Sequence, residues 1–211
     1  MGKIYTALGL MSGTSMDGVD ASIVRSDGNQ EYWIKLDKYF KYEDKIRHKI
    51  INIKDKVLLE DDLKLYSDEI KILEKEITVF HADIVNEILK TLKIEIDFLG
   101  FHGQTILHDP EKKITQQLGD GNLLSKLTKK QVIYDFRQND LKNGGQGAPL
   151  TPIYHKLLAK SFKEEGKIKL PIIILNIGGI ANITIVKDYT DTSKIFSKDI
   201  GPGNCLIDTW V

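Results

Sequence analysis

One segment near the N-terminus, Met11–Asp20, constrains the fold more than any other part of the chain. It separates two apolar runs, residues 4–10 and 21–24, and apolar runs on either side of a short polar segment predict a β-hairpin. The segment is rich in Gly, Ser, Thr and Asp, which allow a sharp bend and turn backbone N–H groups and hydroxyls toward one point. An anion such as phosphate binds at a point of this kind.

An ordinary hairpin turn is the alternative interpretation, because a short Gly/Ser/Asp cluster is also typical of turns. The segment carries more polar groups than a turn needs, however: Ser12, Thr14, Ser15, Asp17 and Asp20. Hydroxyls together with carboxylates favour a site for phosphate and a divalent cation.

Charge and cysteine content limit the classes of protein to which such a hairpin can belong. The 211 residues include 30 Lys and Arg and 30 Asp and Glu, so no global positive field favours nucleic acid or an anionic membrane. Cys205 is the only cysteine, which excludes an internal disulfide and fits a reducing compartment. The chain begins with a strand pattern, and no run approaches the roughly 20 apolar residues of a membrane span. We therefore expect a soluble, cytoplasmic protein.

The periodicity of apolar residues predicts the other elements of the first part of the chain. A continuous stripe at steps of three and four from Tyr66 to Leu92 predicts a long amphipathic helix, with His81 beside the stripe in a structural or surface position. The same criteria predict strands over residues 31–40, 94–101, 114–118 and 131–135, and helices over residues 43–56, 121–129 and 150–160.

A polar cluster, His102–Thr105, directly follows the strand predicted over residues 94–101. Ligands bind at the carboxyl ends of strands in α/β sheets, although a polar turn in which His102 caps the backbone is the alternative. Arg137 can hold a carboxylate or phosphate with its planar fork, or can pair with Asp135 or Asp140. A glycine-rich loop over residues 144–149 then leads into the next helix.

A polar stretch, residues 161–169, is the best candidate for a domain boundary. Beyond it, residues 171–175 and 183–186 predict a second hairpin, whose turn contains Gly178 and Gly179, and this echo of the first hairpin suggests two duplicated lobes. Asp199 precedes a Gly-Pro-Gly turn and a predicted helix. There it is well placed to face a ligand, with helix capping as the alternative.

Six motifs in order along the chain closely resemble the anhydro-N-acetylmuramic acid kinase family, of the sugar-kinase, actin and heat-shock-chaperone superfamily. The motifs are Met11–Asp20, His102–Thr105, Asp135–Arg137, Gly144–Pro149, Asn176–Gly179 and Asp199–Asn204. The resemblance implies an α/β fold: a ribonuclease-H-like lobe over residues 1–165, with a mixed five-stranded sheet and flanking helices, and the first strands of a similar, truncated lobe over residues 166–211.

The resemblance also implies roles for individual residues in ATP-dependent phosphorylation of the sugar O6 with opening of its 1,6-anhydro bridge. Asp199 matches the catalytic base, and Gln104, Thr105 and Arg137 are implied sugar contacts. The resemblance assigns binding of the ATP phosphates to Gly13, Thr14, Ser15, Met16, Asp17, Gly18, Val19 and Asp20. Gly178 and Gly179 are implied to form the opposing phosphate turn, and Asp17 is implied to place Mg²⁺. The implied partners are the sugar and ATP, with a homodimer plausible and no nucleic acid or membrane partner.

Members of the family are considerably longer than this chain, so we expect weak or absent activity from these 211 residues alone. Two other classes of protein remain open. A non-catalytic nucleotide-binding module would keep the phosphate turns and lose the base, and a sugar-binding or regulatory fragment would bind sugar without ATP.

Overall fold

The computed structural model describes residues 2–210 and divides into two compact units, each described below by itself. The first comprises residues 2–28 and 32–147, and the second comprises residues 29–31 and 148–210. The expected lobe boundary lay at residues 165/166, but the contacts divide the chain at Gly147/Ala148, because the helix that precedes residue 165 packs with the later strands. The lobe boundary itself stays a prediction.

A mixed sheet of six strands forms the first unit: β1 (Tyr5–Ser12), β2 (Gly18–Ser26), β3 (Tyr32–Lys41), β4 (Phe98–Asp109), β5 (Ile114–Leu118) and β6 (Val132–Tyr134). The strand order is β3-β2-β1-β4-β5, and β6 also pairs with β4. Strands β1, β2 and β3 form an antiparallel meander, whereas β1 and β4 are parallel. The expected hairpin is confirmed. The expected number of five strands is wrong, because both β5 and β6 pair with the long strand β4.

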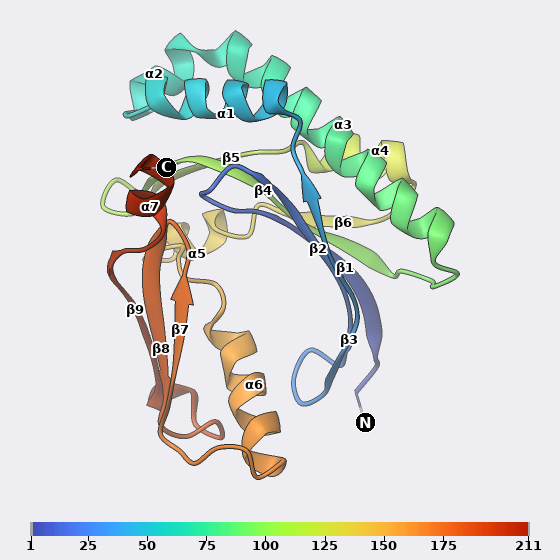
Figure 1. The fold of residues 1–211 in the computed structure, drawn as a ribbon, viewed down its shortest axis with the longest axis vertical. Coiled ribbons are helices and arrows are strands. Elements are labelled where there is room, and N and C mark those ends of the chain that lie inside the picture. The colour runs from blue at the N-terminus through green and yellow to red at the C-terminus, as the bar shows by residue number, and fades with distance from the viewer. Residues whose placement is uncertain (1, 211) are drawn as a thin grey trace. The chain divides into compact units, whose positions relative to one another are not determined.

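Helices α1 (Asp44–Lys56) and α3 (Ser67–Thr91) cover one face of this sheet, as Figure 1 shows. The apolar stripe of α3 is buried as its periodicity predicts, and it packs on alternate residues of β1 and β2, such as Leu8 and Ile23. The other helices of the unit are the short α2 (Glu60–Leu65), α4 (Gly121–Thr128) and α5 (Gln138–Lys142). None of the helices within residues 2–210 combines the length and apolarity that crossing a membrane requires.

Strand β4 continues through the polar cluster that was expected to lie beyond its end. Residues His102–Thr105 therefore belong to the strand, and Gln104 and Thr105 pair with Leu118 and Gln117 of β5. The backbone turns locally at Gly103, where φ is +72°. That conformation lets β4 pair with β6 before Gly103 and with β5 after it.

His81 of α3 is fully buried, so of its two expected positions the structural one is correct. Its Nδ1 lies 2.8 Å from the Ile77 carbonyl oxygen and donates to it, and its ring contacts Phe101 at 4.9 Å between centroids. Nε2 has no hydrogen-bond partner among the described residues. Burial, opposed by the Ile77 hydrogen bond, lowers the pKa of His81 to about 4.

This burial predicts an acid-dependent loss of stability. A histidine whose pKa is lower in the folded state favours folding while it is neutral. Its full contribution to the free energy of unfolding is present above the unfolded pKa of about 6.5, and this contribution is lost as the pH falls through the folded pKa of about 4. At about 1.4 kcal/mol per pKa unit, His81 should cost roughly 2 to 3 kcal/mol of unfolding free energy at pH 4.5 relative to pH 7.5. Urea unfolding of wild type and His81→Phe at both pH values tests this. Equal acid sensitivity of the two proteins would contradict it.

The second unit is an antiparallel meander packed on a helix. It contains α6 (Pro152–Glu164), β7 (Ile172–Ile177), β8 (Ile180–Val186), a 3₁₀ turn (Thr192–Lys194), β9 (Ile195–Pro202) and α7 (Cys205–Trp210). In the order β7-β8-β9, β8 pairs with both neighbours. Helix α6 packs on this sheet (Figure 1). In this contact His155 Nδ1 lies 2.7 Å from Thr184 Oγ1. Lys160 Nζ donates to Gln30 Oε1 at 2.6 Å, which ties residues 29–31 to α6.

Candidate active site

The polar hairpin turn of the first unit is shorter than the motif that predicted it. Strand β1 ends at Ser12 and β2 begins at Gly18, so only residues 13–17 form the turn. Within it the Met16 N–H donates to the Gly13 carbonyl at 3.2 Å, and Met16 has a φ of +54°. Three residues of the implied phosphate loop, Gly18, Val19 and Asp20, lie in β2 instead. Val19 is fully buried in the core, so its side chain is structural.

A hydrogen-bond network in the interior of the unit holds this turn in place. Ser12 Oγ donates to Gln104 Oε1 at 2.6 Å and receives the Tyr42 hydroxyl at 3.0 Å. Gln104 Nε2 in turn donates to the Gly13 carbonyl at 3.1 Å. Ser12, Tyr42 and Gln104 are each at most 1% exposed. Gln104 was expected to contact sugar, but in this structure its amide lies in the interior and holds the turn.

Sequence reasoning missed the part that Tyr42 plays. It follows β3 and lies outside every motif, so only its position two residues after a predicted strand was visible in the sequence. Its backbone N–H also donates to the Asp17 carbonyl at 2.9 Å, so Tyr42 holds the turn at both ends. Burial is the main cause of a raised Tyr42 pKa, which keeps the hydroxyl protonated as a donor.

Replacing the buried amide should therefore destabilise the turn more than removing the tyrosine hydroxyl. Gln104→Leu leaves the Gly13 carbonyl without this donor, at a cost of about 2 to 3 kcal/mol, whereas Ser12 Oγ keeps the Gly18 carbonyl, 3.1 Å away, as an acceptor. Tyr42→Phe removes one neutral hydrogen bond, worth about 1 kcal/mol. Urea unfolding of both variants tests the ranking. Equal losses would show that Gln104 is not the centre of the network.

Two carboxylates beside the turn differ in their electrostatics. Partial burial opposes ionisation of Asp17, but hydrogen bonds from Ser15 Oγ, its own backbone and Tyr39, with the charge of Arg47, outweigh it and lower the pKa of Asp17. Partial burial and the charges of Asp17 and Asp37 raise the pKa of Asp20. An ionised carboxylate with a like-charged neighbour is a donor set that fits a hard cation such as Mg²⁺.

Arg137 makes neither of the two ion pairs considered from the sequence. Its Nε and Nη2 contact His102 Nε2 at 3.1 and 2.8 Å, and Nη1 donates to the Gly147 carbonyl at 2.5 Å. His102 Nδ1 lies 2.8 Å from the Gly103 carbonyl and donates to it, so Nε2 is free to accept from Arg137. Burial, reinforced by the Arg137 charge, lowers the His102 pKa to about 4. The imidazole therefore stays neutral and holds the guanidinium in place.

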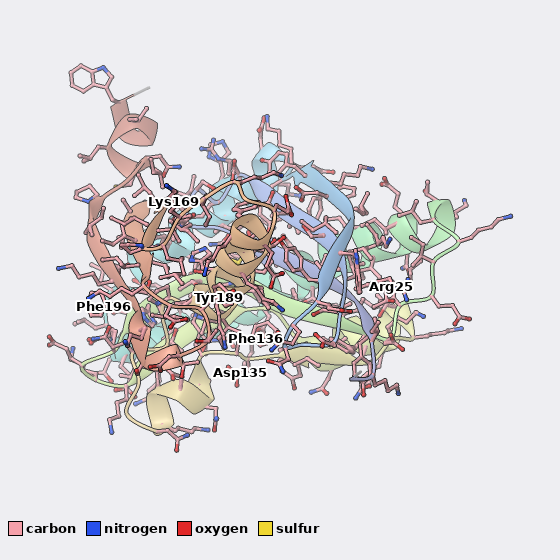
Figure 2. The ribbon with its side chains drawn as sticks, turned by 90° about the horizontal axis from the view of Figure 1, so that it is seen from below. Arg25, Asp135, Phe136, Lys169, Tyr189 and Phe196 are labelled. Atoms are coloured by element: carbon pink, nitrogen blue, oxygen red, sulfur yellow. The ribbon has the colours of Figure 1, made fainter. Side chains whose placement is uncertain are left out.

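A cavity of about 180 Å³ opens beside His102 in the first unit. Strands β4, β5 and β6, residues that follow β5 and β6, and one side chain of α3 form its walls, and Asp135, labelled in Figure 2, belongs to them. Its lining is mostly polar: Glu74, Phe101, His102, Thr115, Gln116, Gln117, Gly119, Tyr134, Asp135 and Gln138. Thr105, the third implied sugar contact, receives the Gln117 amide at 3.3 Å. Thr105 thus contacts Gln117 of this cavity wall, and Arg137 contacts His102 of the same wall.

Asp199 lies in the second unit within β9. The strand continues to Pro202, through part of the Gly-Pro-Gly segment that was expected to form a turn directly after Asp199. The Asp199 carboxylate is exposed. In the register of the two strands, Asp199 lies opposite Asn182 of β8. Helix α7 begins only at Cys205, so Asp199 is not the residue that caps it. The register shifts between Ala181 and Asn182, which is a bulge of the kind that redirects a side chain near a functional site.

The Gly178–Gly179 turn between β7 and β8 is locked to the loop that follows Asp199. Gly203 N–H donates to the Gly179 carbonyl at 2.9 Å, and Asn204 N–H donates to the Gly178 carbonyl at 2.8 Å. A Cβ at Gly203 would lie 2.0 Å from the Gly178 oxygen, so only glycine fits there. The amide oxygens of Asn182 and Asn204 are buried without a partner among the described residues. These acceptors are open to donors from a ligand or water.

Among the side chains that the structure describes, which exclude those of residues 208 and 209, no cluster of three or more His, Cys, Asp or Glu suited to a metal occurs. Mg²⁺ in phosphoryl-transfer sites needs only one or two carboxylates, because phosphates and waters complete its shell. The pair Asp17 and Asp20 meets this smaller requirement.

The mixed sheet, its flanking helices and the polar hairpin turn are consistent with a lobe of a sugar kinase. The family model for anhydro-N-acetylmuramic acid kinase matches residues 5–211, and the chain belongs to this family. It is 54% identical over all 211 residues to the anhydro-N-acetylmuramic acid kinase of Pelagibacter ubique, 41% to that of Rhizobium johnstonii and 38% to that of Agrobacterium fabrum. All of this chain aligns in each case, with 55%, 56% and 56% of the relatives. The chain therefore spans about half the length of these curated relatives.

Proposed function

We propose that the chain provides the first lobe and the catalytic base of a kinase that acts on 1,6-anhydro-N-acetylmuramic acid. The observation that supports this most is the family match, which extends through both compact units and includes Asp199. The product is N-acetylmuramic acid 6-phosphate, so the reaction belongs to peptidoglycan recycling in the cytoplasm. As these residues match only about half of each relative, the activity belongs to the complete protein.

The proposed chemistry couples ring opening to phosphoryl transfer. Asp199 takes a proton from water, the water oxygen forms a bond to C1, and the C1–O6 bond breaks. The departing O6 accepts the γ-phosphoryl group of ATP and ADP leaves, so no charged alkoxide has to be released into solvent. An exposed carboxylate on a hydrogen-bonded strand suits the role of base, because its position is fixed while water still reaches it.

The turn over residues 13–17 is proposed to bind the ATP phosphates from one side, with Gly178 and Gly179 as the second phosphate turn. We assign the phosphate contacts to Gly13, Thr14 and Ser15. Met16, whose N–H donates to the Gly13 carbonyl, closes the turn, and Gly18, Val19 and Asp20 fix the start of β2. Asp17 would hold Mg²⁺, which when bound neutralises phosphate charge. The pKa of Asp17 is already lowered, so the carboxylate is ionised before any cation arrives.

We assign the sugar side to Thr105 and Arg137, with Gln104 supporting them from the interior. Arg137 is a proposed partner for the lactyl carboxylate of the sugar. The neutral His102 orients its guanidinium by accepting from Nε and Nη2, which is the arrangement expected for an arginine that must meet an anion in one fixed direction.

Comparison of two proteins tests the proposal. One is the 211-residue chain, and the other, the joined chain, is the same chain followed by the part of the Pelagibacter ubique relative that lies beyond the matched region. Sugar-dependent ADP release in the presence of ATP and Mg²⁺ is expected from the joined chain and not from the shorter one. Strong turnover by the 211 residues alone would contradict the proposal that the activity requires the complete protein. A folded joined chain without turnover would contradict the function.

A further inference from the structure

A series of hydrogen bonds, which we call the α6 link, connects helix α6 to the strand that carries Asp199. His155 Nδ1 of α6 lies 2.7 Å from Thr184 Oγ1 of β8, and Thr184 Oγ1 lies 3.1 Å from Ser197 Oγ of β9. Ser197 Oγ donates to the Ile183 carbonyl at 2.8 Å. Thr184 is fully buried and His155 is 7% exposed. The α6 link therefore joins three elements of the second unit through side chains that are largely withdrawn from solvent.

The direction of each hydrogen bond in the α6 link follows from the protons that are available. A serine hydroxyl has one proton, and Ser197 gives it to the Ile183 carbonyl, so Ser197 Oγ accepts from Thr184. Thr184 then has no second proton to give and accepts from His155, whose Nδ1 carries the hydrogen. Burial lowers the pKa of His155, so the ring is neutral near pH 7. His155 is therefore the first donor of the α6 link.

The α6 link ends beside the proposed base. Ser197 and Asp199 are alternate residues of β9, so their side chains share one face of the sheet, about 7 Å apart along the strand. They lie opposite Thr184 and Asn182 of β8, respectively. Ile183 lies between these two pairs. The hydrogen bond from Ser197 to the Ile183 carbonyl therefore ties the two strands together at the step next to Asp199.

The backbone pairing of β8 and β9 is interrupted directly beyond Asp199. Asn182 pairs with Asp199, but Ala181 pairs with Gly201, which leaves Ile200 without a partner in β8. A bulge of this kind disrupts the ladder of backbone hydrogen bonds locally. Because the Asp199 side chain is exposed, close packing does not fix it either. The side-chain bonds on the other side of Asp199 supply the constraint that the ladder loses.

Packing of α6 on the sheet does not require a histidine. At the end of this face farthest from Asp199 the side chains are apolar, since Ile172 of β7 and Ile195 of β9 both lie opposite the fully buried Val186. An aliphatic residue at position 155 would extend this apolar contact. The face instead changes from apolar to polar in the direction of Asp199, which relates the α6 link to the base and not to the core.

We propose that His155 is a positioning residue for Asp199. Through Thr184 and Ser197 it fixes the segment of β9 that holds the base, and so the direction from which the carboxylate meets the water that attacks C1. Such a position matters because a displacement of about 1 Å can cost a factor of about 10² in rate. The inference rests on the proposed function, since it takes Asp199 as the base.

The test measures steady-state kinetics of the joined chain with three substitutions. His155→Leu removes the first donor, and Thr184→Val removes the middle hydroxyl while it keeps a similar shape. Both are expected to lower kcat by about 10- to 100-fold, with KM for sugar and ATP within about twofold of wild type. His155→Asn places an amide N–H near the position of Nδ1, so its kcat should stay within about threefold of wild type.

Thr128→Val is the matched control for the loss of a buried hydroxyl. Thr128 lies in α4 of the first unit, and its Oγ1 donates to the Leu124 carbonyl outside the proposed site. Near-normal kcat is expected for it at a temperature below the Tm of every variant. Hydrogen exchange without substrates gives a second measurement: exchange at residues 195–202 should be about tenfold faster in His155→Leu and Thr184→Val, but unchanged in Thr128→Val.

Three results would overturn the inference. One is a kcat for His155→Leu and Thr184→Val no lower than that of Thr128→Val. Another is a kcat for His155→Asn as low as that of His155→Leu, because the Nδ1 donor would then not matter. The third is unchanged hydrogen exchange in β9. If His155→Leu does not fold, Thr184→Val decides. A wild-type joined chain without turnover would instead contradict the proposed function, and the exchange measurement would still decide whether the α6 link holds β9.

Discussion

Asp199→Asn in the joined chain is expected to lower kcat by about 10²- to 10⁴-fold, the usual contribution of a general base. The substitution keeps the shape of the side chain and its place opposite Asn182 in β9. It removes the group that accepts the water proton, so the water is no longer activated for attack at C1. Sugar and ATP binding are expected to change little, because the variant keeps both phosphate turns. Steady-state kinetics and calorimetry with each ligand alone measure the two effects.

Asp191→Asn is the control for this variant. Asp191 is an exposed carboxylate of the same unit, and its Oδ1 accepts from Ser193 outside the proposed site. Near-normal kcat is expected for it. If Asp199→Asn retained most of the wild-type kcat, Asp199 would not be the base. If it lost sugar binding together with turnover, Asp199 would be a binding residue.

Gly103→Ala is expected to destabilise the first unit by about 3 kcal/mol and to lower its Tm by roughly 6 to 12 °C. Two costs add at this position. The φ of +72° is unfavourable for any residue with a Cβ, and that Cβ would lie 2.3 Å from the Leu118 carbonyl oxygen of β5. Strand β5 would have to move away from β4, which also disturbs Gln104 and Thr105.

Gly28→Ala separates the two costs in this prediction. Gly28 has a nearly identical φ of +75°, but nothing lies within 4 Å of a Cβ built there. It should therefore show only the conformational cost of about 1 kcal/mol. Thermal unfolding of both variants measures the difference. Equal Tm losses would show that the approach of Leu118 to Gly103 does not constrain the strand.

Elements with strong periodicity could be predicted from the sequence. In α3, β1 and β2 the apolar residues recur with the period of a helix or a strand, because each of these elements buries one face. The hairpin and the long helix followed from this directly. The number of strands could not be predicted in this way, because β5 and β6 are short and only their shared pairing with β4 makes both part of the sheet.

Two polar motifs were expected outside strands, although both lie within them. His102–Thr105 was expected to follow a strand that ends at residue 101, and Asp199 was expected directly before a Gly-Pro-Gly turn, whereas the structure places them in β4 and β9. A strand that carries functional side chains loses the apolar alternation by which strands are recognised. The burial of Gln104 depends on Ser12 and Tyr42, which are distant in sequence, and no local pattern predicts that.

Mass analysis of the sugar product tests the central claim most directly. With the joined chain, ATP and Mg²⁺, each converted molecule of 1,6-anhydro-N-acetylmuramic acid should gain one phosphoryl group and one water together, since attack at C1 and transfer to O6 occur in one reaction. ADP should form in equal amount, and Asp199→Asn should lose all three signals in parallel. ATP hydrolysis without a change in the sugar, or sugar that gains water without phosphate, would contradict the account.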